Sequence, residues 1–327
     1  MRVLIVKMSS MGDIIHTLPA VTDAAKAIAN IQFDWVAEEA FTEIPRWHQH
    51  IDKVIPIALR SWRKQLWQTA KSGEVKQFYK KLRSQRYDFV LDAQGSIKSA
   101  VITRLSCGYR LGMDKNSVRE KPAYLAYQRS FSVSRQQHAI IRLRQLFAKA
   151  LNYALPTTGP DYGLNKESLI LPKIALAKNY LIFVPNASRS AKCWSDKSWS
   201  LLLEKMAKRG VNVFIPWGSE QEREKVVRLI KGYPLAHILP YLNLNEMAAV
   251  LSNAKAVVSV DTGLSHLAAA LGIPTMVLYG PTNPSLIGTI GPSQLHIKVQ
   301  AQGVDENYLN QLALKKIEDS LDRILLS

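Results

Sequence analysis

Short apolar runs separated by longer amphipathic segments recur along the chain. In the first half, apolar runs at residues 2–6, 33–37, 54–58 and 89–92 have the length and composition of buried strands. Helical patterns lie between these runs, and the first of them is expected at residues 13–29. Strands that alternate with helices predict a parallel sheet of the α/β class.

The same alternation returns in the second half of the chain. A turn-rich stretch at residues 155–160 interrupts the pattern and indicates the start of a linker. Further strands are predicted at residues 180–184, 211–216, 237–239, 256–260 and 275–279. Because 327 residues are enough for two cores, we expect two α/β domains in tandem with a cleft between them.

Composition and cysteine content indicate the cellular compartment but not the function. The content of 47% hydrophobic and 21% charged residues is that of an ordinary globular protein. Cys107 and Cys193 form no CxxC motif or Cys/His cluster, which argues against a disulfide framework or a zinc site. The apolar run at the start ends at Lys7, and no run reaches the ~18 residues of a transmembrane helix. We therefore expect a soluble protein inside the cell.

Positive charge is concentrated in the first half. The formal net charge is +17; residues 1–165 contain 25 Lys/Arg and 13 Asp/Glu, a net of +12, and residues 166–327 contain 18 and 13, a net of +5. The first half is therefore the expected site for a large anionic partner.

The densest basic segment is residues 60–86, with nine Lys/Arg and a single acid. Arg60, Arg63 and Lys64 have the spacing that places side chains on one helical face, and Trp62 and Trp67 lie among them. Such a face suits a membrane surface, a phosphorylated lipid headgroup or a nucleic acid. The alternative is a solvated helix face, which the charge imbalance makes less satisfactory.

Two loops that follow predicted strands have residues suited to chemistry. After the first strand, Gly12 permits a tight turn, and Asp13 is either a helix cap or a general base. After the strand at 256–260, Gly263 opens a helix whose free N–H groups suit a diphosphate. Asp261 and His266 beside it either contact sugar hydroxyls or only cap and pack. No GxGxxG or GxxxxGK[ST] motif is present.

Two further loops in the second half offer weaker signals. Residues 185–194 supply the Ser188 hydroxyl and two cations, Arg189 and Lys192, for the other side of a diphosphate; an exposed basic loop is the alternative. Residues 216–222 place Glu222 where it would bind ribose, although an acidic first helical turn explains the same residue.

Three stretches together resemble a known family. They are MRVLIVKMSSMGDIIHTLPA at the start, DAQGSIKSA at 92–100 and VSVDTGLSHLAAALGIPTMVLYGPTNPSLIG at 258–288. They resemble the bacterial lipopolysaccharide heptosyltransferases of glycosyltransferase family 9, over essentially the whole chain. The resemblance is strongest to the members that add the first heptose.

This resemblance implies a GT-B fold, with two Rossmann-like domains facing across a cleft. The implied domains are residues 1–165 for the acceptor, 166–310 for ADP-heptose, and a last helix at 311–327 that packs back on the N-terminal domain. The implied reaction transfers L-glycero-D-manno-heptose from ADP-heptose to the inner Kdo of Kdo2-lipid A, with inversion and with no obligatory metal or cofactor. The protein would work as a monomer at the cytoplasmic face of the inner membrane, and without nucleic acid.

The resemblance also implies roles for individual residues. Asp13 would be the catalytic base, made more basic by cleft closure and desolvation, and Lys192 would offset charge on the departing ADP. Donor contacts would come from Ser188, Lys192, Glu222, Leu242, Asp261, Thr262, Gly263 and His266. Acceptor contacts would come from Ser10, Gly12, Arg60, Arg63, Lys64, Lys98 and Arg119. The chain departs from the family pattern at Ala187, where a threonine is usual, and at Cys193, where a histidine is common.

Three alternatives remain open from the sequence. A heptosyltransferase that adds the second heptose differs only in its acceptor. A nucleic-acid-binding α/β protein would bind DNA or RNA in a salt-sensitive way and would not need Asp13. A nicotinamide oxidoreductase on a related fold is disfavoured by the missing GxGxxG motif. Fold alone does not choose among them.

Overall fold

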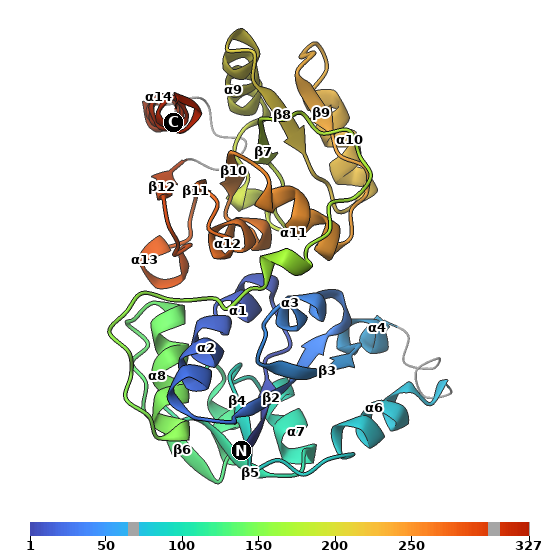
Figure 1. Cartoon of the computed structure of the whole chain (residues 1–327), viewed down its shortest axis with the longest axis vertical. Coiled ribbons are helices and arrows are strands. Elements are labelled where there is room, and N and C mark those ends of the chain that lie inside the picture. Colours follow the sequence, from blue (N-terminus) through green and yellow to red (C-terminus); the bar gives the residue numbers. More distant parts are fainter. Residues whose placement is uncertain (65–71, 300–307, 327) are drawn as a thin grey trace. The chain divides into compact units, whose positions relative to one another are not determined.

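The computed structural model describes residues 1–64, 72–299 and 308–326 (Figure 1). The chain divides into two compact units, Met1–Asn165 and Lys166–Ser327, each with its own parallel sheet. In the described part of the chain, no helix is both long enough and apolar enough to cross a membrane.

The sheet of the first unit has six parallel strands in the order β3-β2-β1-β4-β5-β6. β1 and β4 are neighbours at its centre, where the winding of the chain reverses direction, and such a switch point is where open α/β sheets bind ligands. The strands are β1 (Arg2–Val6), β2 (Gln32–Glu38), β3 (Ile51–Ile57), β4 (Phe89–Asp92), β5 (Tyr109–Met113) and β6 (Arg129–Phe131). The four predicted strands are confirmed; β5 and β6 were not predicted.

Helices connect these strands, as parallel pairing requires. They are α1 (Met11–Ile15), α2 (Leu18–Ala27), α3 (Glu43–Arg46), α4 (Leu59–Lys64), α6 (Glu74–Leu82), α7 (Ile97–Leu105) and α8 (Ala139–Leu151), with short 3-10 turns η1 (Glu39–Phe41) and η2 (Lys121–Ala126). The single helix expected at 13–29 is wrong, because α1 and α2 are separate. Pro19 lies in the first turn of α2, where its missing N–H costs no helical hydrogen bond.

The second unit repeats the same topology with the order β12-β11-β10-β7-β8-β9, so β7 and β10 are its central pair. Its strands are β7 (Tyr180–Val184), β8 (Asn212–Ile215), β9 (Ala236–Ile238), β10 (Ala256–Val260), β11 (Thr275–Tyr279) and β12 (Gln294–Lys298). Its helices are α9 (Asp196–Lys208), α10 (Glu220–Leu229), α11 (Leu244–Ser252), α12 (Gly263–Ala270), α13 (Pro284–Ile287) and α14 (Tyr308–Leu326), with 3-10 turns η3 (Lys166–Ser168) and η4 (Ser190–Lys192).

The last helix belongs to the second unit, which corrects the expected return to the N-terminal domain. Ile317 and Leu321 of α14 are fully buried in the core that also contains Trp199 and Met206 of α9. Lys205 of α9 forms an ion pair of 2.6 Å with Glu318 of α14, at the margin of this apolar contact.

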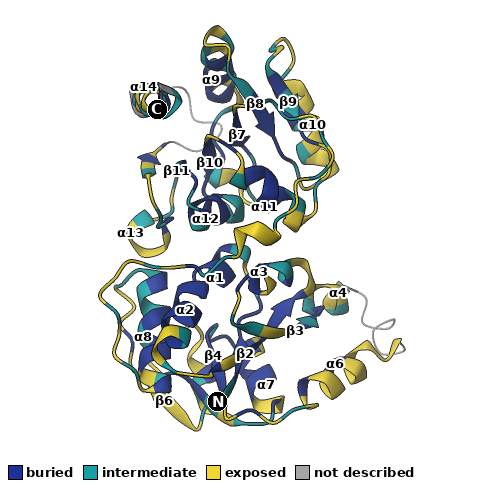
Figure 2. Ribbon diagram, viewed as in Figure 1, coloured by how far each residue is buried: buried dark blue, intermediate teal, exposed yellow. Residues whose placement is uncertain are grey.

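Each sheet is buried by the helices on its faces (Figure 2). All five residues of β7, β10 and β11 are buried, and residues 3–6 of β1 have no exposed surface. Continuous apolar strands of this kind are those of a parallel sheet covered on both faces. The rigid strands leave the loops at their carboxyl ends to carry the polar side chains.

Candidate functional site

In the first unit, the loops after β1 and β4 are joined at the switch point. The side-chain oxygen Oε1 of Gln94 accepts hydrogen bonds from the backbone N–H groups of Met8, at 2.7 Å, and Ser9, at 3.4 Å. The buried carboxylate of Asp92 in turn accepts the backbone N–H groups of Gln94 and Gly95, at 2.9 and 2.8 Å. These hydrogen bonds hold the two loops together at the carboxyl ends of β1 and β4.

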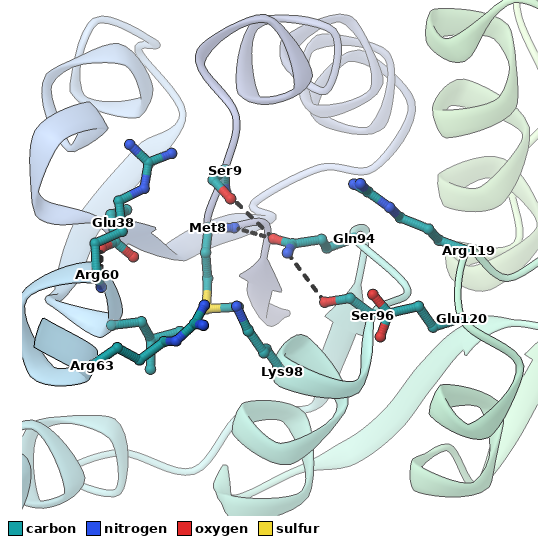
Figure 3. A pocket seen from close by; sticks show the side chains of 11 residues that line it. Met8, Ser9, Glu38, Arg60, Arg63, Gln94, Ser96, Lys98, Arg119 and Glu120 are labelled. Carbon is teal, nitrogen blue, oxygen red and sulfur yellow. Dashed lines mark hydrogen bonds between the residues drawn. The ribbon is translucent and has the colours of Figure 1, made fainter. Parts of the chain in front are cut away.

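A pocket of about 200 Å³ opens above these loops (Figure 3). Four cationic side chains and two carboxylates line it, so its charge is positive. Basic side chains reach it from α4, from α7 and from the loop after β5. The lining residues are Met8, Ser9, Glu38, Leu59, Arg60, Arg63, Gln94, Ser96, Lys98, Arg119 and Glu120.

Local contacts explain how the cations reach the pocket. The buried carboxylate of Glu38 accepts the backbone N–H of Arg60 at 2.8 Å and so fixes the first turn of α4. Gly95 has φ +68°, and a Cβ there would lie 2.9 Å from the Val118 side chain. The Gly95 carbonyl accepts the backbone N–H of Glu120 at 2.9 Å, so this glycine lets the segment with Arg119 pack against the pocket.

Asp13 is in the first turn of α1, a few residues after Ser9 of the pocket lining. Its Oδ2 accepts two hydrogen bonds from Ser10, from the backbone N–H at 3.0 Å and from the hydroxyl at 2.7 Å. Its Oδ1 is 3.7 Å from the ammonium of Lys7, which is buried and donates to the carbonyl of Ala93. Burial opposes the charge on Asp13, but Lys7 and Ser10 outweigh it and lower its pKa to about 2. Asp13 is therefore an ionised carboxylate at neutral pH, with 38% of its side chain exposed.

The predicted acceptor residues divide into three groups. Arg60, Arg63, Lys98 and Arg119 are brought together as pocket lining. Ser10 and Gly12 belong to the turn that holds Asp13 and do not line the pocket. Lys64 ends α4, but its side chain, like Trp67, lies outside what the structure describes.

At the switch point of the second unit, a carboxylate accepts two hydrogen bonds and has a histidine nearby. Oδ2 of Asp261, directly after β10, is 2.6 Å from the Lys192 ammonium and 2.6 Å from the Thr282 hydroxyl, and His266 Nε2 is 3.8 Å from Oδ1. Burial disfavours the charge on Asp261, but these neighbours hold its pKa well below its usual range. Lys192 remains the more open member of the pair, with 23% of its side chain exposed.

The remaining predicted donor residues lie on neighbouring loops of this sheet. Thr262 is the N-cap of α12 and Gly263 its first residue, so both are at the helix start where an anion would bind. Ser188 is exposed in the loop after β7. The Glu222 carboxylate accepts the Gly218 N–H at 2.7 Å, and Leu242 is half-buried in the loop after β9.

The structure adds residues that the sequence reasoning missed. The sequence pattern marks Lys7 only as the end of an apolar run, and it assigns no role to Gln94 or Thr282 although both lie within motifs. For Lys7, the signal was a charged residue directly after a buried strand. No spacing rule joins Thr282 to Asp261, because the strand β11 and helix α12 separate them along the chain.

In the described residues, no group of three or more His, Cys, Asp or Glu side chains is placed to hold a metal ion. The chemistry available includes that of the open Asp13 carboxylate, the partly open Lys192 ammonium and the cationic pocket.

Comparison with known proteins identifies the family of the chain. The family model "Glycosyltransferase family 9 (heptosyltransferase)" matches residues 75–315. Lipopolysaccharide heptosyltransferase 1 of Pseudomonas aeruginosa is 51% identical over 91% of this chain and 83% of its own length. The protein of the same name from Escherichia coli K12 is 45% identical over 97% and 99%.

Solved structures give the same result for the fold. The E. coli heptosyltransferase WaaC with ADP superposes with a TM-score of 0.90 at 43% identity, covering 99% of this chain and 100% of the other. The same enzyme with ADP-2-deoxy-2-fluoro heptose gives 0.87. E. coli heptosyltransferase II, at 20% identity and 0.79, shares the fold. The expected α/β class with two Rossmann-like sheets is confirmed.

Proposed function

The chain belongs to glycosyltransferase family 9, the heptosyltransferases, and from this membership we propose that it moves L-glycero-D-manno-heptose from ADP-heptose to the inner Kdo of Kdo2-lipid A. Relatives named lipopolysaccharide heptosyltransferase 1, at 45% and 51% identity, support the first-heptose step. The observation that carries the assignment of roles is the contrast between an open carboxylate in the first unit and an open ammonium in the second.

The first unit binds the acceptor. Kdo and the lipid A headgroup carry carboxylates and phosphates, and the pocket presents the guanidinium groups of Arg60, Arg63 and Arg119 with the ammonium of Lys98. Guanidinium groups bind carboxylate and phosphate through paired, charge-assisted hydrogen bonds. Glu38 and Glu120 limit the net charge and orient the neighbouring backbone.

Asp13 accepts the proton of the attacking hydroxyl. The hydroxyl oxygen forms a bond to the anomeric carbon, the bond from that carbon to ADP breaks, and ADP leaves with the electron pair. A carboxylate with a pKa of about 2 is a weak base toward a resting alcohol. It takes the proton as the hydroxyl becomes acidic during attack, and in the same step it stabilises positive charge at the sugar ring.

The second unit binds the donor and stabilises the leaving group. The N–H groups at the start of α12, next to Thr262 and Gly263, face anions with the positive end of the helix dipole. Lys192 offsets the charge that develops on ADP, and Asp261 holds its ammonium in place. Ser188, Glu222, Leu242 and His266 complete the donor contacts in this proposal. No metal or other cofactor is part of it.

The product of the reaction tests this proposal. The protein is mixed with ADP-heptose and Kdo2-lipid A or its deacylated form, and ADP release and acceptor mass are followed. We expect a gain of one heptose. Transfer only to an acceptor that already carries heptose would assign the second step of the pathway instead, and no transfer to either acceptor would contradict the proposal.

The acceptor also sets the place of action. A lipid-linked acceptor lies in the inner membrane, so we propose that the protein works as a monomer at the cytoplasmic face of that membrane. The excess of positive charge in residues 1–165 supports this location, because the headgroups of that face are partly anionic.

A further inference from the structure

A second cationic pocket lies in the first unit and has no role in the chemistry above. It measures about 450 Å³ and is lined by four arginines from three segments of the chain, while no carboxylate of the described residues lines it. The lining residues are Arg83, Arg86, Arg104, Ser106, Cys107, Gly108, Tyr109, Arg110 and Gln128. Tyr109 begins β5, so this pocket is at the amino ends of the strands, whereas the first pocket is at their carboxyl ends.

Hydrogen bonds to neutral carbonyl groups hold two of the four arginines in place. Arg110 donates from Nε to the carbonyl of Ala126 at 2.9 Å, and Arg83 donates to the carbonyl of Leu105 at 3.0 Å. Burial and the nearby Arg104 lower the pKa of Arg110, as expected when like charges lie together. Guanidinium groups that are held by neutral groups keep their charge available, and guanidinium is well suited to bind phosphate.

An exposed apolar ridge on α7 connects the two pockets. Ile97, Val101 and Leu105 follow one another at intervals of four residues, and 50, 52 and 37% of their surfaces are exposed. At one end, Lys98 of α7 lines the first pocket, and at the other end Arg104 lines the second. The sequence of α7 contains no acidic residue.

Helix α6 extends the same surface. Most of its exposed positions are basic or apolar, the exceptions being Glu74 and Gln77 in its first turn, and its buried positions are Phe78 and Leu82. Figures 1 and 2 show the helix and its exposed side. Tyr79 is exposed, and Arg83, which follows the helix, stacks on the Tyr79 ring at 5.3 Å while it bonds to the end of α7. Exposed aromatic and aliphatic side chains among cations are typical of surfaces that enter the boundary between lipid headgroups and acyl chains.

We propose that α6, α7 and the start of β5 form a docking surface for a bilayer containing anionic phospholipids. The ridge of Ile97, Val101 and Leu105 enters the headgroup boundary, and the arginine pocket holds lipid phosphates. A nucleic acid would satisfy the arginines but would leave the aliphatic ridge without a partner. The idea rests on the proposed function in one respect: docking by this ridge brings the first pocket to the surface where a lipid-linked acceptor lies.

Vesicle sedimentation tests the surface without any enzymatic reaction. Vesicles of phosphatidylcholine alone are compared with vesicles that also contain phosphatidylglycerol. We expect the wild type to sediment with the anionic vesicles and to be released by salt. Val101→Glu with Leu105→Glu should weaken binding about tenfold or more, because charge is placed at an apolar contact. Arg86→Ala with Arg104→Ala should weaken it about fivefold per arginine.

Matched variants in the second unit serve as controls. Ile170→Glu adds a charge at another exposed aliphatic residue, and Lys231→Ala with Lys255→Ala removes two exposed cations; both should bind vesicles like the wild type. Transfer to the soluble, deacylated acceptor should be unchanged in every variant. If that transfer is absent even in the wild type, the proposed function fails while the vesicle result still stands.

Several results would overturn the docking surface. One is that the wild-type protein binds vesicles equally well with and without phosphatidylglycerol. Another is that the ridge variant and the arginine variant both bind vesicles as strongly as the wild type. Sedimentation velocity provides a third: self-association that both variants abolish would make this face an interface between copies of the chain. Binding of an oligonucleotide that prevents vesicle binding and survives the ridge variant would identify a nucleic-acid surface instead.

Discussion

In the first unit Lys7 is buried and Asp13 is open, whereas in the second unit Asp261 is buried and Lys192 is the more open partner. The exposed side-chain fractions are 8% and 38% for Lys7 and Asp13, and 4% and 23% for Asp261 and Lys192. Both pairs lie at the switch point of a six-stranded sheet with the same strand order. In both units, the lysine that follows the first strand bonds to a residue that follows the fourth.

The comparison shows that the sheet topology determines where each pair lies, and that burial determines which charged group of the pair is accessible. A buried ammonium keeps Asp13 ionised, and in the proposed mechanism this negative charge lies where a hydroxyl must lose its proton. A buried carboxylate fixes the Lys192 ammonium, and in the proposed mechanism this positive charge lies where a diphosphate departs. We therefore propose opposite tasks for the same two residue types, because a different member of each pair is left accessible.

Among substitutions in the second unit, removal of the Lys192 ammonium should reduce turnover the most. Lys192→Ala eliminates the charge opposite the leaving group, and we expect turnover to fall about 10²–10³-fold. ADP affinity should also fall. Lys205→Ala, which removes a lysine from the ion pair with α14, is the control and should leave turnover near normal. Unchanged turnover in Lys192→Ala would remove this lysine from the mechanism.

Removing cations from the first pocket should affect the acceptor alone. Arg63→Ala with Lys98→Ala is expected to raise KM for the acceptor about 10- to 100-fold, since two charge-assisted contacts are lost. The dissociation constant of ADP-heptose, measured by calorimetry, should change by no more than a few-fold. A comparable loss of donor affinity would contradict the division of labour between the units.

The smallest expected effect is a change in the pKa of Asp13 when its neighbour Lys7 is replaced. In Lys7→Met the cationic neighbour is gone, so the pKa should rise from about 2 toward the ordinary value. The ionised form of Asp13 contributes stability above its unfolded pKa of 3.8, and this is lost as pH falls toward 2. Carboxyl ¹³C NMR from pH 7 to about pH 3 should show titration in the variant and almost none in the wild type. Identical curves would mean that Lys7 does not set the charge state.

Most of the strands could be predicted from the sequence, because buried parallel strands are continuous apolar runs. β1, β4, β7, β10 and β11 were predicted with the bounds that the structure shows. β5, β6 and β12 were missed: β6 has only three residues, and β5 and β12 carry charged or glycine positions that hide the apolar pattern. The break between α1 and α2 was missed because the residues on both sides are apolar.

The candidate site was predictable as a set of loops and not as a set of contacts. Residues after strands, such as Asp13 and Asp261, could be selected because carboxyl-end loops converge. Which of them becomes buried depends on partners far along the chain, such as Ala93 for Lys7 and Thr282 for Asp261. The low pKa of Asp13 followed from Lys7, a residue for which the sequence suggested no role.

The most direct test of the roles of the two lysine–aspartate pairs is a comparison of ADP-heptose binding with turnover in Asp13→Asn. This change removes the charge and keeps the shape, so ADP-heptose affinity should stay within a few-fold while turnover falls about 10²–10⁴-fold. Asp319→Asn, an exposed aspartate on α14, is the matched control. If Asp13→Asn turns over near the wild-type rate, the open carboxylate of the first unit is not the base, and the account of the two pairs is wrong.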